Sequence, residues 1–247
     1  MTIDLNCDMG ESFGRYTIGN DELIMPYITS CNIACGFHGG DPNIIINTIK
    51  MANHYDVKIG AHPSYPDRQG FGRRKMIIPS EELISLLQYQ IAAVDKLSTI
   101  YAEGLHHVKP HGALYNHAYE NDQVAKAIVN AMMPWKESTI LYAQYGSVLA
   151  KIAKEEGINT MLEGFVDRKY TDDLNLMSRS KPEAIHSKIS TMVDQIVNMV
   201  KHNKMITSKG FQAISVETVC IHGDHPDALE IAKILSTALE NEGINIQ

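Results

Sequence analysis

The sequence lacks the compact motifs that mark several large enzyme classes. It contains no GxxxxGK(S/T) phosphate-binding loop, no GxSxG nucleophile elbow and no HExxH metal-binding pair. These absences argue against a P-loop nucleotidase, an α/β-hydrolase with an elbow serine and a zincin protease. Any catalytic site must therefore be assembled from residues that are distant along the chain.

The chain is also poor in cysteine. Its four cysteines, Cys7, Cys31, Cys35 and Cys220, include no CxxC pair. The sequence opens Met-Thr-Ile-Asp without the pattern of a signal peptide, so we expect a cytoplasmic protein with free thiols. Cys31 and Cys35 could ligate zinc, but small buried core residues are the favoured interpretation.

Positive charge is scarce. The 22 basic residues are outnumbered by 29 acidic residues, which gives a net charge of −7. Nucleic-acid or anionic membrane surfaces need clustered Lys and Arg, so neither partner is expected. The uncharged stretch 23–40 contains Pro26, Asn32 and His38 and makes a poor membrane span.

Short β-prone runs alternate with helical patterns along all 247 residues, and no linker marks a domain boundary. Helices are predicted from Pro42 to about His54 and from Leu229 to Leu239. Another helix is predicted to begin at Ser80, and a further one to follow the apolar stripe from Ile185 to Met199. This alternation predicts a parallel sheet, and polar residues after nearly every strand favour a barrel over an open sheet. We therefore expect one α/β barrel domain spanning 1–247. The predicted strands are 2–7, 31–35, 57–61, 106–109, 139–143, 160–165 and 218–221.

Polar residues that suit catalysis follow these predicted strands. His-Gly occurs three times, at 38, 111 and 222, each time just after a strand. Glycine lets the backbone turn while the imidazole faces the barrel mouth. The fifth strand alone ends without a group that titrates near neutrality. The convergent candidates are Asp8, Glu11, His38, His62, Lys109, His111, His222 and Asp224.

Two chemistries suit such a cluster, and the residues alone leave both open. A divalent metal held by Asp8, His38 and His62 could activate water. Alternatively, a carboxylate could act as general base while His or Lys stabilises an oxyanion. Glu163 and Asp167 could instead pair with Arg168 and brace the mouth. The remaining histidines, at 54, 106, 107, 117, 186 and 202, are given structural or surface roles.

A basic loop, DRQGFGRRK at 67–75, follows the third strand. Its glycines and three arginines make it a candidate lid over an anionic substrate or phosphate, and a solvated loop is an equal alternative. Asp41 is interpreted as a helix cap before Pro42.

Several segments resemble the LamB/YcsF family, and together they cover essentially the whole chain in order. They are 4–11 (DLNCDMGE), 32–38 (NIACGFH), 59–67 (IGAHPSYPD), 70–74 (GFGRR), 107–115 (HVKPHGALY), 165–170, 178–180 and 220–224 (CIHGD). The resemblance implies a (β/α)7 barrel of the glycoside hydrolase/deacetylase type. Because the family is similar to the A subunit of prokaryotic 5-oxoprolinase, it also implies cleavage of 5-oxoproline to L-glutamate with ATP as co-substrate. The implied partners are 5-oxoprolinase subunits B and C.

This resemblance gives each candidate residue an expected role. Asp8 or Glu11 would be the general base, and His38, His62 and His111 would bind a metal or stabilise the tetrahedral intermediate. Lys109 would neutralise phosphoryl or oxyanion charge, and Arg73 or Arg74 the substrate carboxylate. Further substrate contacts are expected from Asn6, His222 and Asp224. The alternatives are a stand-alone metal-dependent deacetylase or amidohydrolase of the same barrel class, and a non-catalytic scaffold for partner subunits.

Overall fold

Parallel strands close into a barrel in the computed structural model, which describes residues 1–177 and 181–247. Residues 178–180, part of the family resemblance, lie outside the described residues. Each strand pairs with the next, and β1 pairs with both β2 and β9, which closes the ring. Within the described chain the barrel has seven strands, so the predicted (β/α)7 architecture is confirmed. They are β1 (Thr2–Met9), β2 (Ser30–Ala34), β3 (Lys58–His62), β4 (His107–Val108), β5 (Ile140–Gln144), β6 (Thr160–Phe165) and β9 (Thr218–Ile221).

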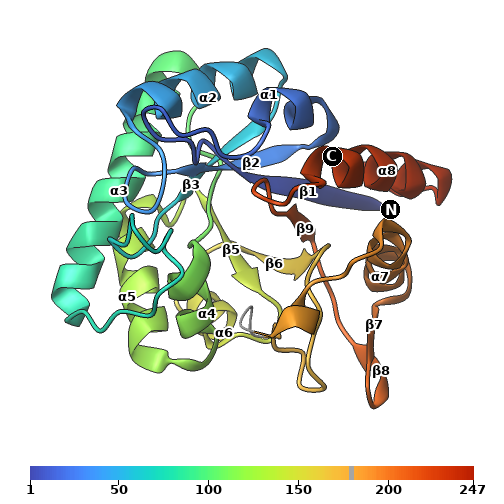
Figure 1. Cartoon of the computed structure of the whole chain (residues 1–247). Helices are drawn as coiled ribbons and strands as arrows, with labels where there is room; N and C mark the ends of the chain where they lie inside the picture. Colours follow the sequence, from blue (N-terminus) through green and yellow to red (C-terminus); the bar gives the residue numbers. More distant parts are fainter. Residues whose placement is uncertain (178–180) are drawn as a thin grey trace.

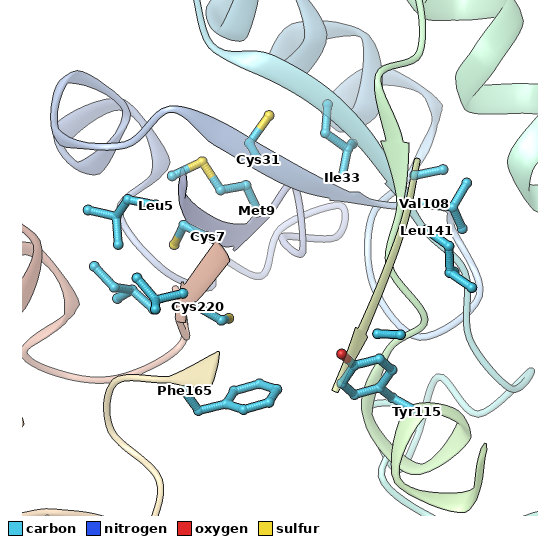
Figure 2. Packing of buried hydrophobic residues seen from close by; sticks show 14 of the residues in the cluster. Leu5, Cys7, Met9, Cys31, Ile33, Val108, Tyr115, Leu141, Phe165 and Cys220 are labelled. Carbon is cyan, nitrogen blue, oxygen red and sulfur yellow. The ribbon is translucent and has the colours of Figure 1, made fainter. Parts of the chain in front are cut away.

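Side chains of β1 alternate between two environments, as the period of a strand requires. Leu5, Cys7 and Met9 are buried in the hydrophobic layer (Figure 2). Asp4 and Asn6 point into the barrel, because their side chains bond to residues of β5 and β6, strands that do not neighbour β1. Barrels of this general kind usually fill their interior with branched aliphatic residues. Here a polar column occupies that space instead.

Helices pack around the strands and bury their apolar stripes against them (Figure 1). Asp41 caps α2 by accepting from Asn43 N and Ile44 N at 3.0 Å, and Pro42 occupies the first turn. This confirms the interpretation of Asp41 as a cap. The helices are α1 (Asp21–Ile24), α2 (Pro42–His54), α3 (Ser80–Tyr101), α4 (Gly112–Glu120), α5 (Asp122–Met132), α6 (Val148–Glu155), α7 (Ile189–His202) and α8 (Ala228–Asn241), with short 3-10 turns at Met25–Tyr27, Met133–Trp135 and Pro182–Ala184.

Three features differ from the sequence-based expectation. The apolar stripe predicts a helix from Ile185, but α7 begins at Ile189, because Ile185 is extended and bridges Arg168 while His186 N donates to Asp167 O. An antiparallel hairpin, β7 (Lys204–Thr207) and β8 (Gly210–Ala213), also follows α7 and projects from the barrel (Figure 1). Its strands are too short to be read from periodicity. The same holds for β10 (Asn245–Ile246), which pairs with β1.

No helix in the described part of the chain is both long and apolar enough to cross a membrane. The four cysteines are all buried and free, as expected for core residues.

Candidate functional site

A cavity of about 630 Å³ opens at the carboxyl ends of the barrel strands. Most of the predicted site residues line it together: Asp8, Glu11, His62, Arg73, Lys109, His111, His222 and Asp224. Asn6 and His38 are buried behind this lining, in contact with it. Arg74 is not among the lining residues; its guanidinium is exposed and bound by Asp67. The sequence-based convergence of strand ends is therefore observed, and Arg73 is the arginine that reaches the cavity.

Lys109 is the buried cation at the centre of the site. It follows β4 directly, and its side chain is only 2% exposed. The ammonium Nζ lies 3.0 Å from Asp8 Oδ1, 2.9 Å from Glu163 Oε1, 3.1 Å from Asn6 Oδ1 and 2.9 Å from Cys220 Sγ. A buried charge is stable only when it is paired and hydrogen-bonded, and this ammonium has two carboxylates. Although burial alone would lower its pKa, these neighbours raise the pKa of Lys109 well above its usual range.

The two carboxylates at the end of β1 have opposite electrostatic environments. Burial would raise the pKa of Asp8, but the charges of His62 and Lys109 outweigh it and hold the pKa well below its usual range. For Glu11, burial and then the charges of Asp8 and Asp224 raise the pKa well above its usual range. Asp8 is therefore held ionised beside a carboxyl group that favours its protonated form. Such divergent pairs are typical of acid–base chemistry.

Three histidines and Glu11 form a compact group beside Asp8. His38 Nε2 lies 3.0 Å from Glu11 Oε1, and His111 Nδ1 lies 3.0 Å from His62 Nε2 and 3.6 Å from Glu11 Oε1. Four atoms, one from each residue, lie within 4.8 Å of one another. Burial, followed by the neighbouring histidines, lowers the pKa of both His38 and His111. His38 and His111 are therefore held neutral beside Glu11.

Backbone carbonyls orient two of these imidazoles. His62 Nδ1 lies 2.6 Å from Lys109 O, and His111 Nε2 lies 2.8 Å from Phe71 O. A carbonyl only accepts, so each of these ring nitrogens carries the proton. The facing nitrogens, His62 Nε2 and His111 Nδ1, point toward each other within hydrogen-bond distance.

This group fits a divalent cation. Four ligands at about 2.0–2.1 Å around a tetrahedral ion lie roughly 3.3 Å apart, close to the observed spacings, and metal-bound histidines commonly donate their other N–H to a carbonyl. In addition, His38 Nδ1 is buried without a partner among the described residues. The structure therefore joins His38 and His62 to Glu11 and His111, whereas Asp8 belongs to a second group with Cys220 and His222. In that second group Lys109 Nζ already occupies the cation position.

Gly72 allows the basic loop to close over the histidines. Its φ is +64°, and a Cβ there would lie 2.6 Å from His111 Cδ2 and 2.9 Å from His38 Cβ. Glycine avoids both the strain and the clash. The next residue, Arg73, bonds Asp224 after β9, so loop 67–75 is tied across the cavity mouth.

Comparison with known proteins places the chain in a family. The LamB/YcsF family matches residues 3–247. The chain belongs to the LamB/YcsF family. A relative from Oceanobacillus iheyensis, named as the A subunit of 5-oxoprolinase, is 46% identical over 246 residues, covering 99% of this chain and 96% of the relative. A relative of the same name from Pyrococcus abyssi is 42% identical over 247 residues, with 100% and 97% covered.

Two solved structures are similar in fold to this LamB/YcsF chain. The lactam utilization protein from Thermus thermophilus superposes with a TM-score of 0.95 at 37% identity, covering 100% of this chain and 99% of that one. A putative cellobiose-phosphate cleavage protein from Enterococcus faecalis has a TM-score of 0.60 at 13% identity, covering 100% and 96%, and shares the fold alone.

Sequence reasoning did not single out Asn32 of this LamB/YcsF site, and it placed Glu163 at the mouth with Arg168 rather than beside Lys109. Glu163 lies inside the barrel, bonded to Lys109, to Asn6 and to the hydroxyl of Tyr115 at 2.7 Å. Asn32 holds Asp8 Oδ1 at 2.8 Å. The available signal was the placement of polar residues at alternate positions of otherwise apolar strands. Ser30 and Asn32 alternate with Cys31 and Ile33, and Glu163 stands between Leu162 and Gly164.

Proposed function

We propose that this chain is the A subunit of an ATP-dependent 5-oxoprolinase, which opens the lactam of 5-oxo-L-proline to L-glutamate with partner subunits B and C. The relatives that carry the 5-oxoprolinase name and the lactam utilization protein support this proposal. The observation that carries it is the pair of carboxyl groups, Asp8 and Glu11, whose pKa values are displaced in opposite directions inside one cavity.

The chemistry needs activation, because a five-membered lactam is a resonance-stabilised amide. In the proposed sequence the amide oxygen attacks the γ-phosphorus of ATP and releases ADP. Water then adds to the activated ring carbon and gives up a proton, and the ring C–N bond breaks as the nitrogen takes up a proton. The acyl phosphate reacts with a second water to give L-glutamate and phosphate. In total, 5-oxoproline, ATP and two waters give glutamate, ADP and phosphate.

Side chains of the cavity suit these proton transfers. Asp8, held ionised, orients the attacking water and receives its proton as general base. Glu11, whose raised pKa keeps a proton available, donates to the departing ring nitrogen. Lys109 neutralises the negative charge that develops on the former carbonyl oxygen and its phosphoryl group. His62 and His111 lie between the two carboxyls, with His62 Nε2 3.4 Å from Asp8 Oδ1 and His111 Nδ1 3.6 Å from Glu11 Oε1.

Arg73, at the mouth, would bind the substrate carboxylate in place of Asp224, its present partner. His222 lies 2.7 Å from Asp167 through Nδ1 and lines the same side of the cavity, where it would bound the substrate. Asn6 does not line the cavity; it accepts a hydrogen bond from Lys109 Nζ inside the barrel and so supports the position of that ammonium. Because the sequence has no glycine-rich phosphate loop, we assign much of the ATP binding to subunits B and C.

The test is glutamate formation from 5-oxo-L-proline and ATP, assayed with this chain alone, with the partners alone and with all subunits. Only the complete set should release glutamate, and Asp8→Asn should lower the rate by about 10²–10⁴-fold with the complex still assembled. Wild-type glutamate release by the Asp8→Asn and His62→Ala complexes would contradict the assignment.

A second candidate, a stand-alone metal-dependent amidohydrolase, is favoured by one observation: the Glu11–His38–His62–His111 group. A divalent cation held by these four residues would polarise a substrate carbonyl and acidify a bound water. The two candidates differ at Glu11, which is a proton donor in the first and a ligand in the second. Lactam or N-acetyl hydrolysis by the chain alone, without ATP and abolished by a chelator, would support the second.

A further inference from the structure

Gln144 is a buried polar residue that lines the cavity. It is the last residue of β5, and it is 3% exposed. It lies on the same face of the strand as Tyr142, whose hydroxyl donates to Asp4 inside the barrel. Gln144 therefore points inward at the carboxyl end of the barrel, and it lines the cavity.

The amide nitrogen of Gln144 is buried and has no hydrogen-bond partner among residues 1–177 and 181–247. Leaving such a donor unsatisfied is costly, and buried polar groups in native proteins are nearly always paired. Gln90, the other comparably buried glutamine, shows the usual arrangement. Its Oε1 accepts from Ser64 N at 2.9 Å, and its Nε2 donates to Ser64 O at 2.9 Å. The contrast indicates that the partner of Gln144 is a ligand.

The neighbours of Gln144 place it close to the reacting groups. β5 and β6 pair so that Gln144 is opposite Glu163, the carboxylate that lies 2.9 Å from Lys109 Nζ. Tyr115 and Phe165, with ring centroids 6.2 Å apart, form an aromatic wall of the same cavity (Figure 2). A small flat ring on this wall could reach both the Gln144 amide and the Lys109 ammonium.

We infer that the Gln144 carboxamide recognises the cyclic amide of the substrate, with Oε1 accepting from the ring N–H and Nε2 donating to the ring carbonyl. A five-membered lactam holds its N–H and C=O on the same side, as a cis amide. A carboxamide presents one acceptor and one donor with the same spacing, so two parallel hydrogen bonds form. Neither an ester nor a ketone ring offers the N–H. The inference rests on the proposed function and names its specificity determinant.

The first test compares two ligands of the wild-type complex. 5-Oxo-L-proline is used as the substrate, and 3-oxocyclopentane-1-carboxylate, in which CH₂ replaces the ring N–H, is assayed as a competitive inhibitor. We expect the ketone acid to bind at least ~10-fold more weakly, because it leaves Oε1 without its donor. Equal affinity of the two ligands would overturn the inference without using any variant.

The second test uses Gln144→Met, with Gln90→Met as the matched control. We expect Gln144→Met to raise KM for 5-oxoproline by ~10–100-fold and to remove the preference for the lactam over the ketone acid. Its melting temperature should not fall, since no protein hydrogen bond is lost. Gln90→Met should instead lower the melting temperature by roughly 2–10 °C, because Ser64 loses both bonds.

Unchanged KM and unchanged discrimination in Gln144→Met, with glutamate still formed, would overturn this inference and leave the proposed function standing. A lowered melting temperature with unchanged KM would assign Gln144 a structural role and also overturn it. Failure of the wild-type complex to form glutamate from 5-oxoproline would overturn the proposed function and this inference together.

Discussion

The imidazoles of His38 and His111 are stacked face to face, with ring centroids 3.6 Å apart and planes inclined by 3°. Both rings are almost fully buried, so two positive charges at this separation would be strongly unfavourable. Their pKa values are lowered mainly by burial and then by neighbouring histidines. The site is therefore built to hold these rings neutral at physiological pH.

That neutrality predicts how stability depends on pH. The unfolded histidines titrate near 6.5, whereas their folded pKa values are lower, so the unfolded chain binds more protons below pH ~6.5. The free energy of unfolding therefore decreases as the pH is lowered below this value. Glu11 opposes this trend, because its raised pKa makes the folded chain bind the extra proton. The lowered histidines are His38, His106, His107, His111 and His117.

Glu11→Gln removes the opposing group. Between pH 6.5 and 5 we expect the variant to lose stability more steeply than the wild type, by about 1.4 kcal/mol per pH unit for one proton. Urea denaturation at a series of pH values measures the slope. An equal or shallower slope in Glu11→Gln would show that Glu11 is not protonated in the folded chain.

Lys109 gives a second prediction. Lys109→Met leaves Asp8 and Glu163 facing each other without their cation and should lower the free energy of unfolding by about 3–5 kcal/mol. Lys109→Met combined with Glu163→Gln should recover part of that loss, because one of the stranded charges is gone. Denaturant unfolding measures both.

A surface pair provides the control for Lys109. Lys151 and Glu155 form an exposed i,i+4 pair on α6, and Lys151→Met should cost less than about 0.5 kcal/mol. If the double variant at Lys109 and Glu163 were no more stable than Lys109→Met, the account of stranded carboxylates would be wrong.

The sequence predicted the barrel because apolar residues recur in it with the spacing of helices in some segments and with the spacing of strands in others. The apolar stripe of α3 and the cap at Asp41 specify helices locally, and parallel strands linked by helices leave few arrangements. The strand ends also had to meet at one rim, so Asp8, His62 and Lys109 were found together. These are consequences of local pattern and chain connectivity.

The pairing within the site could not be predicted in the same way. Which cation faces Asp8 depends on how far the Lys109 side chain reaches across the barrel, and Glu163 enters only because β6 lies opposite. The grouping of Glu11 with His38 depends on the loop after β1, which has no period. Tertiary distances decide these contacts, and a single sequence does not contain them.

A third prediction concerns metal ions. We expect the Glu11–His38–His62–His111 group to bind one Zn²⁺ and to release protons as it does so, since Glu11 must ionise. Under the proposed function, bound zinc removes the proton donor and inhibits glutamate formation; in a metal-dependent amidohydrolase it would activate. Calorimetry in two buffers of different ionisation enthalpy measures the proton release.

Variants separate the two groups of candidate ligands. His38→Ala should lose zinc binding, whereas Cys220→Ala, in the group where Lys109 occupies the cation position, should keep it. Zinc binding that survives His38→Ala but not Cys220→Ala would mean that the ion displaces Lys109 from Asp8.

Asp4, at the far end of the barrel from the cavity, gives the last prediction. Its carboxylate can only accept, so Thr218 must donate to it, and Thr218 in turn accepts from Asn6 Nδ2 at 2.7 Å. Together with Glu163 Oε1, which accepts from the same Nδ2 at 3.0 Å, this bond fixes the Asn6 amide with Oδ1 toward Lys109 Nζ at 3.1 Å. Asp4→Asn can donate to Thr218 and so removes one of the two contacts that set this direction. We expect kcat to fall about 10-fold with little change in KM, because a misplaced Lys109 ammonium weakens stabilisation of the transition state more than it weakens substrate binding.

Tyr142→Phe is the matched control, because it removes one donor from Asp4 at 3.1 Å without reversing any bond to Thr218. It should lower stability by about 1–2 kcal/mol while kcat stays within roughly threefold of the wild type. Steady-state kinetics of the complex and denaturant unfolding of the chain provide both readouts. Equal losses of kcat in the two variants would mean that Asp4 acts on the barrel as a whole. A loss confined to Asp4→Asn requires the directed path through Thr218 and Asn6, since that path is what the two variants do not share.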